Sequence, residues 1–276
     1  DGTPPAMSGW TSGSSGMPLK VPLDQEDVSA HDALKFFVET ESGFSMGDVL
    51  ANITNETFPQ HPFHSLLRVY RKIKLSAFDD ERQIMDILRR ARPSIIHSYP
   101  SVFAVLLGMN NDSKDPIRLK SVISGAEVLP RKLRSRIEDS FSCKVFDHYG
   151  SMEFGSIANE CPEHHRLHIN PWSCIVEIIG RNGETMDSGA GEVALTSLHG
   201  SAMPFIRYMI GDIARLGKPC PCGRGSQVLE SLDGRSYTHD IVLPSGRIRN
   251  SSALDITEAM GDMLGYQVVQ ETENRF

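Results

Sequence analysis

The spacing of hydrophobic residues changes along the chain and predicts two kinds of architecture. Residues 81–90 show the amphipathic pattern of a helix, which Pro93 stops. The apolar run at residues 94–98 predicts a short buried strand, and Pro100 can open the next helix. We therefore expect a helix, a strand and a second helix in succession.

The same alternation continues to residue 150. Residues 119–124 predict a buried strand that ends at Gly125, and Pro130 opens a helix that extends to Phe141. Residues 143–150 then return as a strand. Because helices and strands alternate here, the pattern predicts a parallel sheet with flanking helices.

The two ends of the chain differ from this middle part. Residues 1–18 are rich in Gly, Ser and Pro, which predicts a loop with no strand before it. After residue 170 short strand patterns alternate with turn signals, which predicts a hairpin-rich β subdomain. Residues 239–249 predict a further hairpin, and residues 254–264 an amphipathic helix.

Composition and charge exclude several classes of protein. Hydrophobic residues make up 39% of the 276 residues, so the chain can bury an ordinary core. No apolar run approaches the roughly 20 residues of a membrane-spanning helix, and no secretory signal is visible, so we expect a cytoplasmic protein. The formal charge of -7 argues against a nucleic-acid partner. The basic residues 131–136 are interpreted as a solvated helix face.

Small and hydroxylated residues gather near the N-terminus in the sequence TSGSSGMP. Such residues let a backbone wrap around a phosphate chain and donate hydrogen bonds to it, although a flexible linker has a similar composition. The segment is not a Walker P-loop, because Gly16 is followed by Met17 and Pro18. The candidate phosphate-binding residues are Thr11, Ser12, Gly13, Ser14, Ser15 and Gly16.

The sequence DHYGSMEFG directly follows a predicted strand, where ligands collect in α/β sheets. Tyr149 offers a ring for stacking on a base, and Glu153 offers a hard oxygen ligand for magnesium. An ordinary strand-to-helix turn with Ser151 as a cap explains the same residues. Further along, Asp212 follows a glycine turn and can accept hydrogen bonds from both ribose hydroxyls.

The five cysteines are too few and too irregular for a disulfide framework. Cys161 has three histidines close by in the sequence, and Cys220 and Cys222 form a second short cluster. These two clusters can supply a tetrahedral zinc site, and reduced free thiols are the alternative. We expect buried, apolar roles for Cys143 and Cys174.

Five motifs in this order resemble the adenylate-forming superfamily of acyl-CoA synthetases, and more narrowly its phenylacetate-CoA ligase and capsule-biosynthesis-type branch. They are TSGSSGMP from residue 11, SGAE from 124, HYGSMEFG from 148, IRYMIGD from 206 and LDGR from 232. The resemblance implies an α/β N-terminal domain with parallel sheets, flanking helices and a β-rich subdomain. This adenylation core would occupy residues 1–234, incomplete at its N-terminal side. The hinge and the start of a small α+β domain would occupy residues 235–276.

The resemblance also implies roles for individual residues. Thr11, Glu153 and Arg235 would be catalytic, with Glu153 on magnesium and Arg235 near the ribose or phosphate. Tyr149 would stack on adenine and Asp212 would hold the ribose. Other nucleotide-contacting residues would be Gly125, Ala126, Glu127, His148, Gly150 and Ser151. The ligands of a structural zinc would be Cys161, His168, Cys220 and Cys222, with His164 and His165 as substitutes for His168.

The resemblance implies an AMP-forming acid–thiol ligase. Such an enzyme uses ATP and magnesium to convert a carboxylic acid into an acyl-adenylate, and it then uses CoA to form a thioester. An aryl or other hydrophobic acid is the expected substrate, in a pocket near His97, Tyr99 and Ser124. An ordinary polar pair at a strand end is an alternative interpretation of His97 and Tyr99. Transfer to an amine or a carrier-protein thiol, and a non-catalytic zinc-stabilised nucleotide-binding module, remain alternatives. The family's C-terminal lysine is expected outside this chain, and a homodimer is a further expected association.

Overall fold

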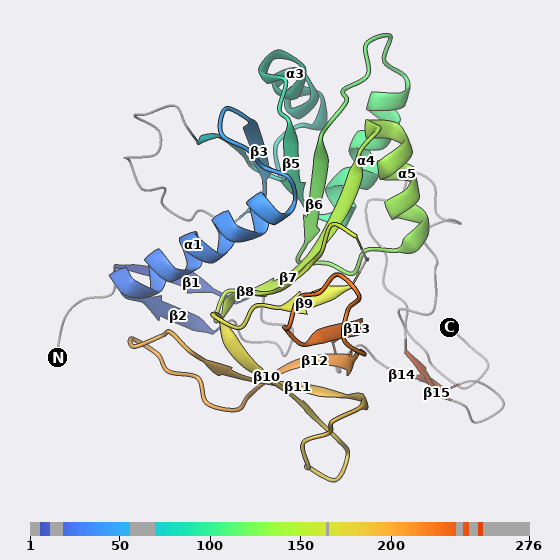
Figure 1. Cartoon of the computed structure of the whole chain (residues 1–276). Coiled ribbons are helices and arrows are strands. Elements are labelled where there is room, and N and C mark those ends of the chain that lie inside the picture. Colours follow the sequence, from blue (N-terminus) through green and yellow to red (C-terminus); the bar gives the residue numbers. More distant parts are fainter. Residues whose placement is uncertain are drawn as a thin grey trace.

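An eleven-stranded mixed sheet forms the centre of the protein (Figure 1). The computed structural model describes residues 6–11, 19–55, 70–163, 166–235, 240–242 and 248–250. The strands of the central sheet are β3 (Val49–Ile53), β4 (Arg71–Leu75), β5 (Ile95–Ser98), β6 (Ser121–Gly125), β7 (Lys144–Ser151), β8 (Gly155–Glu160), β9 (Leu167–Ile169), β10 (Cys174–Ile179), β11 (Gly189–Ser197), β12 (Tyr208–Leu216) and β13 (Val228–Arg235). Their spatial order is β10-β11-β12-β13-β9-β8-β7-β6-β5-β3-β4.

The sheet changes from parallel to antiparallel at β7. The strands β4, β3, β5, β6 and β7 pair in parallel, whereas every neighbouring pair from β7 to β10 is antiparallel. Parallel neighbours need crossover connections, which the helices α3 (Glu81–Ala91), α4 (Pro100–Asn111) and α5 (Arg131–Phe141) provide between β4 and β7. The predicted α/β fold with a β-rich second part is confirmed, and both parts belong to one continuous sheet.

Local signals set the ends of these helices. Asp80 caps α3 by accepting hydrogen bonds from the first-turn backbone, and the helix ends where Arg92 turns left-handed at a φ of 48°. Pro100 occupies the first turn of α4, and α5 begins directly after Pro130. At Ser142, a left-handed residue ends α5. The helices predicted from these proline and periodicity signals are therefore confirmed.

Apolar side chains cover both faces of the parallel strands. On one face Ala51, Ile96 and Val122 pack against α3, α4 and α5. On the other face Leu50, Ile95 and Ile123 pack with Val38 from α1 (Gln25–Glu41). Because neighbouring residues of a strand point to opposite faces, strands buried on both sides contain nearly continuous apolar runs.

The N-terminal segment contains structure that the sequence did not predict. The strands β1 (Met7–Trp10) and β2 (Lys20–Leu23) form an antiparallel pair, so the expectation of no strand before the Gly/Ser-rich loop was wrong. Only Gly9 of β1 is buried, so this strand shows no alternating apolar pattern. The helix α1 follows, and Asp24 caps it through a reciprocal capping box with Asp27.

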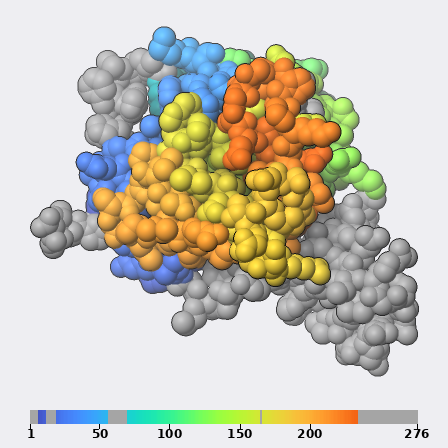
Figure 2. Space-filling model, turned by 60° about the horizontal axis from the view of Figure 1, so that its bottom comes forward, coloured from blue at the N-terminus to red at the C-terminus, as the bar shows by residue number. Residues whose placement is uncertain are grey.

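The loop after β11 holds α1 over the sheet. Figure 2 shows this loop, in orange, against the blue N-terminal segment, where Ser201 donates a hydrogen bond to the carboxylate of Asp24. Nearer the C-terminal end of the helix, the ring of Phe37 meets Trp172 edge to face, with centroids 5.4 Å apart. The antiparallel half of the sheet thus helps to position α1.

A further predicted hairpin is confirmed by the antiparallel strands β14 (Asp240–Val242) and β15 (Ile248–Asn250). The helix predicted at residues 254–264 lies outside the described residues, and the domain boundary after residue 234 stays a prediction. Within the described part of the chain, no helix has the length and apolar character needed to cross a membrane.

Candidate functional site

Three of the predicted nucleotide motifs meet in the central sheet. The hydroxyl of Tyr149 in β7 donates a hydrogen bond to Oδ2 of Asp212 in β12, at 2.7 Å. Asp212 is also the register partner of Arg235 in the neighbouring strand β13. Residues far apart in the sequence therefore meet in one part of the sheet.

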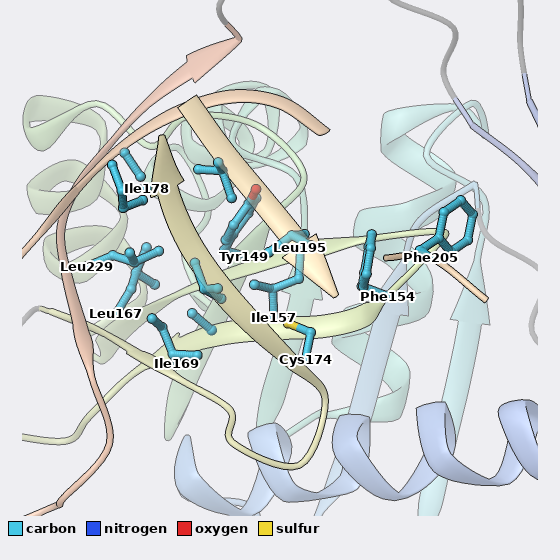
Figure 3. Close-up of a cluster of buried hydrophobic side chains, with 14 of the residues drawn as sticks. Tyr149, Phe154, Ile157, Leu167, Ile169, Cys174, Ile178, Leu195, Phe205 and Leu229 are labelled. Atoms are coloured by element: carbon cyan, nitrogen blue, oxygen red, sulfur yellow. The ribbon is translucent and has the colours of Figure 1, made fainter. Parts of the chain in front are cut away.

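The ring of Tyr149 lies in the core. It is 6% exposed and belongs to the same apolar cluster as Ile157 and Leu195, which Figure 3 shows around it. Its neighbours His148 and Gly150 line a cavity on the other side of β7, as the alternation of side chains along a strand requires. Stacking of this ring on adenine stays a prediction.

A cavity of about 80 Å³ opens at the carboxyl ends of β5, β6 and β7. Among its walls are seven of the predicted site residues: His97, Tyr99, Gly125, Ala126, His148, Gly150 and Ser151. Other described residues that line it are His31, Asp32, Lys35, Thr54, Gly155 and Ser156. The cavity thus lies where ligands are expected in a parallel sheet.

Two further predicted residues lie near this cavity but do not line it. Ser124 is fully buried within β6. Glu127 is exposed and accepts hydrogen bonds from the backbone N–H and the hydroxyl of Ser101, at 2.9 and 2.8 Å, in the first turn of α4. In this structure Glu127 therefore caps a helix, and a contact with adenine stays a prediction.

Part of the cavity wall is bare backbone. A Cβ atom at Gly150 would lie 2.7 Å from the carbonyl oxygen of Gly155, and one at Gly125 would lie 3.0 Å from the carbonyl oxygen of His148. Both distances are too short for a larger residue without a shift of the strand backbone. Ala126 adopts a left-handed φ of 65° directly after β6. Close packing of neighbouring strand backbone therefore requires glycine at positions 125 and 150.

Two buried histidines form the inner part of the cavity. The rings of His97 and His148 meet edge to face, with centroids 5.7 Å apart. Burial, and after it the positive charge of Lys35, lower the pKa of His148 to about 4, and the same two causes lower the pKa of His97 well below its usual value. Both imidazoles are therefore neutral at neutral pH. Nε2 of His148 lies 2.9 Å from the hydroxyl of Ser156.

Thr11 and Glu153 lie on adjoining elements. The backbone of Thr11 donates to the carbonyl oxygen of Leu19, and its hydroxyl accepts from the backbone of Leu19, both at 2.9 Å. Thr11 thereby fixes one end of the candidate phosphate segment, whose remaining members Ser12, Gly13, Ser14, Ser15 and Gly16 lie outside the described residues. Gly9 of β1 packs so closely on Met152 that a Cβ atom would lie 2.0 Å from its sulfur.

That contact places the β1–β2 pair beside the turn that contains Glu153. The turn connects β7 to β8, so the segment is a hairpin and the alternative of a strand-to-helix turn was wrong. The side chain of Glu153 borders a second, smaller cavity together with Asp27, His31 and His199. His31 lines both cavities and therefore lies between Glu153 and the buried histidine pair.

The four predicted zinc ligands form one cluster. Their ligand atoms, from Cys161, His168, Cys220 and Cys222, all lie within 4.8 Å of one another. The Sγ atoms of Cys161 and Cys220 are 3.9 Å apart, and Sγ of Cys222 is 3.6 Å from Nε2 of His168. Zinc bonds of about 2.0 to 2.3 Å would place tetrahedral ligand atoms roughly 3.5 to 3.8 Å apart, so the cluster fits this ion.

The surroundings of the cluster also suit a metal. Nδ1 of His168 lies 3.1 Å from the hydroxyl of Ser226, which can fix the ring with Nε2 toward the cysteines. The substitutes His164 and His165 lie outside the described residues. Away from the cluster, Cys174 is buried as expected, and Cys143 is half-buried.

One residue of the basic run 131–136 departs from the predicted solvated face. Arg134 donates to Oε1 of Glu160 and to the carbonyl oxygen of Val145, both at 2.7 Å, and its side chain is 16% exposed. Arg131 and Arg136 are exposed as expected. Arg134 thus attaches α5 to β7 and β8. The run of basic residues in the sequence does not indicate this structural role.

Half of the cavity residues that the sequence did not single out belong to α1. His31 and Lys35 are four residues apart and share a helix face, with Asp32 beside them. The sequence signal for this helix is the capping box of Asp24 and Asp27, which indicates where it begins. The capping box does not indicate which face of the helix lines the cavity.

Comparison with known proteins agrees with this geometry. Residues 2–197 match the family model of the AMP-binding enzymes. The chain is 29% identical to a phenylacetate-coenzyme A ligase of Thermus thermophilus over 175 residues, which are 60% of this chain and 39% of the relative. It is 32% identical to the enzyme of the same name from Aromatoleum evansii over 177 residues, 59% of this chain and 38% of the relative. The match therefore spans about two fifths of these relatives.

Solved structures show the same fold. A 2-hydroxyisobutyryl-CoA ligase in complex with 2-HIB-AMP has a TM-score of 0.76 and 19% identity, over 94% of this chain and 57% of that chain. An anthranilate CoA ligase in complex with anthranoyl-AMP has a TM-score of 0.66 and 15% identity, over 88% and 50% of the two chains. These structures confirm the fold, and the family model and the sequence relatives support the resemblance to the adenylate-forming superfamily and its phenylacetate-CoA ligase branch.

Proposed function

The chain belongs to the family of AMP-binding enzymes, and on this premise we propose that it activates a carboxylic acid with ATP and passes the acyl group to CoA. The observation that carries the proposal is a cavity at the carboxyl ends of the parallel strands, lined by residues of the predicted motifs, in the same sheet in which Tyr149 bonds to Asp212. The names of the sequence relatives support CoA as the acceptor. A cytoplasmic location and a homodimer stay predictions.

The proposed reaction has two steps. A carboxylate oxygen first bonds to the α-phosphorus of ATP while the bond from that phosphorus to the β-phosphate bridge breaks, which releases pyrophosphate. The sulfur of the CoA thiolate then bonds to the acyl carbon, and AMP leaves. The protein must hold two anions in line and stabilise the charge on the phosphate oxygens, and neither task needs covalent chemistry from the protein in the first step.

The chain's own residues divide these tasks. We assign Asp212 to the ribose hydroxyls, with Tyr149 fixing its carboxylate through the 2.7 Å hydrogen bond. Gly125 and Gly150 contribute main chain to the wall of the cavity, where we place the reacting groups. Thr11 fixes the base of the phosphate segment. The two neutral histidines add no positive charge and can take part in hydrogen bonding with the acid.

Magnesium, when bound, would neutralise charge on the phosphates, and Glu153 is the residue that we propose to hold it. Its carboxylate offers the hard oxygen that this ion prefers. The proposal is supported by position, because the turn that contains Glu153 lies against β1, the strand that precedes the phosphate segment in the sequence. The neighbouring side chain of Asp27 adds a second carboxylate at the same small cavity.

Zinc would have a structural role. Four protein ligands would surround the ion, from Cys161, His168, Cys220 and Cys222. A tetrahedral site with four protein ligands has no open position for a reacting group. Cys161 follows β8, His168 lies in β9, and the two other cysteines precede β13. The ion would therefore fasten the antiparallel part of the sheet at its centre.

Exchange of labelled pyrophosphate into ATP tests this function. The purified protein is incubated with ATP, magnesium and each member of a panel of aromatic, aliphatic and hydroxylated acids. We expect exchange that depends on the acid, and AMP release on further addition of CoA. Acid-dependent exchange without CoA-dependent AMP release would indicate an amine or carrier-protein acceptor. Nucleotide binding without exchange for any acid would overturn the proposal in favour of a binding module.

A further inference from the structure

The last turn of α1 carries charges of the unfavourable sign for that end of a helix. The C-terminal end of a helix bears a partial negative charge, so basic side chains stabilise it and acidic side chains destabilise it. The last turn of α1 contains no basic residue, but it contains Glu39 and Glu41. These two carboxylates therefore need positive partners from other parts of the chain.

Each carboxylate has a cation from a distant element beside it. Nζ of Lys72 in β4 lies 2.8 Å from Oε1 of Glu39, whose side chain is fully buried. The guanidinium of Arg224, in the loop before β13, forms an ion pair with Oε2 of Glu41. The Glu41 side chain is 23% exposed, but this oxygen atom is shielded from solvent. Loss of Arg224 would thus leave a buried charge without its partner.

The loop that carries Arg224 is part of the Cys/His cluster. Arg224 lies two residues after the cluster member Cys222 and two residues before Ser226, whose hydroxyl lies 3.1 Å from Nδ1 of His168. Between Cys222 and Arg224, Gly223 adopts a left-handed φ of 83°, which lets the chain turn tightly. The cluster therefore constrains the loop on both sides of Arg224, and zinc, when bound, would fasten it further.

The helix α1 also carries side chains that line the cavity. These are His31, Asp32 and Lys35. At a rise of about 1.5 Å per residue, Glu41 lies only about 9 Å from Lys35 along the helix axis. Because a helix transmits a displacement over such a distance as a rigid element, a shift of its last turn changes where these side chains stand relative to the strands.

We propose that Arg224 is a positioning residue of the ligand site: the cluster loop holds it, it neutralises Glu41, and α1 is thereby fixed over the cavity. The contribution to ligand binding rests on the proposed function, in which this cavity belongs to the site for ATP and the acid. The Cys/His cluster thus has a role at the site in addition to its role in stability. Arg224 itself touches neither substrate.

Native-state hydrogen exchange, measured by mass spectrometry, tests the link between the cluster loop and α1 without any ligand. Arg224→Ala is expected to speed amide exchange in residues 25–41 about fivefold or more, whereas α3, on the opposite face of the sheet, should exchange as before. Removal of zinc from the zinc-loaded protein by a chelator should likewise speed exchange in α1 more than in α3. Unchanged exchange of α1 after either treatment, or equal acceleration of α1 and α3, would overturn the proposal.

A double-mutant cycle separates the charge pair from other effects of removing Arg224. Glu41→Gln removes the unfavourable charge at the helix end, so Arg224→Ala should have little further effect on exchange in a Glu41→Gln protein. Arg224→Lys keeps the positive charge and should retain most of the protection of α1. The matched control is Arg89→Ala, which removes an ion pair with Asp86 within α3 and should leave α1 unchanged. Independent, additive effects of Arg224→Ala and Glu41→Gln would contradict the proposal.

Isothermal titration with ATP and magnesium then shows whether the position of α1 matters to the site. At a temperature where circular dichroism shows each variant to be folded, Arg224→Ala should raise the dissociation constant about fivefold, and Arg224→Lys and Arg89→Ala should change it less than about twofold. An unchanged dissociation constant despite faster exchange of α1 would overturn the positioning role. ATP binding by the unmodified protein without acid-dependent pyrophosphate exchange would remove the proposed activity and leave this proposal intact, whereas no ATP binding at all would overturn both.

Discussion

Glu153→Gln is expected to lower the rate of acid-dependent pyrophosphate exchange by about 100-fold or more, with little effect on folding. Glutamine preserves the size of the side chain but lacks the negative charge that a divalent cation requires. The side chain is half-buried in the turn between β7 and β8, and the core residues beside it are unchanged by this substitution. The measurements are the exchange rate at saturating magnesium and the melting temperature.

The control for this variant is Glu184→Gln, which removes an exposed carboxylate in the turn after β10. We expect this control to exchange like the unmodified protein. A magnesium titration adds a second readout, because Glu153→Gln should need a higher magnesium concentration for half-maximal exchange. Unchanged exchange and an unchanged magnesium requirement would remove Glu153 from the metal site.

Cys220→Ser is expected to abolish zinc binding and to lower the free energy of unfolding by about 4 kcal/mol or more. Cys220 is buried, and its Sγ lies 3.9 Å from Sγ of Cys161 in the four-residue cluster. Serine is a poor zinc ligand, so the three remaining side chains would lose the ion that closes their cluster. Zinc content by elemental analysis and unfolding by denaturant measure the two effects.

Cys143→Ser is the matched control, because this half-buried cysteine lies outside the cluster. It should keep about one zinc ion per chain, as a closed four-ligand site requires, and lose only about 1 kcal/mol of stability. If protein purified without chelators holds no zinc, or if the two cysteine variants are equally stable, the structural zinc site is refuted.

The parts of the fold that the sequence predicted are those with local signals. Pro93, Pro100 and Pro130 mark helix ends through their backbone preferences, which act within a few residues. The short strand β1 has one buried residue and no such signal, so it was missed. The joining of the two halves into one sheet depends on pairing between distant strands, such as β9 with β13, which no local pattern contains.

Some residues of the candidate site could also be predicted from the sequence, and others could not. The four members of the Cys/His cluster were proposed from two short sequence clusters and the family resemblance, and the structure brings them together. The hydrogen bond between Tyr149 and Asp212 was not predicted, because the sequence gave these residues separate roles at a nucleotide. The contribution of α1 was not predicted, because His31 and Lys35 reach the cavity only through the position of the helix over the sheet. That position depends on contacts with the loops around β10 and β11, made by distant residues.

Transfer of oxygen from the acid to AMP is the most direct test of adenylate formation. The acid that gives the fastest exchange is labelled with ¹⁸O in its carboxylate and incubated with ATP, magnesium and CoA, and the AMP is analysed by mass spectrometry. Attack of the carboxylate on the α-phosphorus predicts AMP that carries one ¹⁸O atom. Unlabelled AMP, or release of ADP and phosphate, would contradict the account.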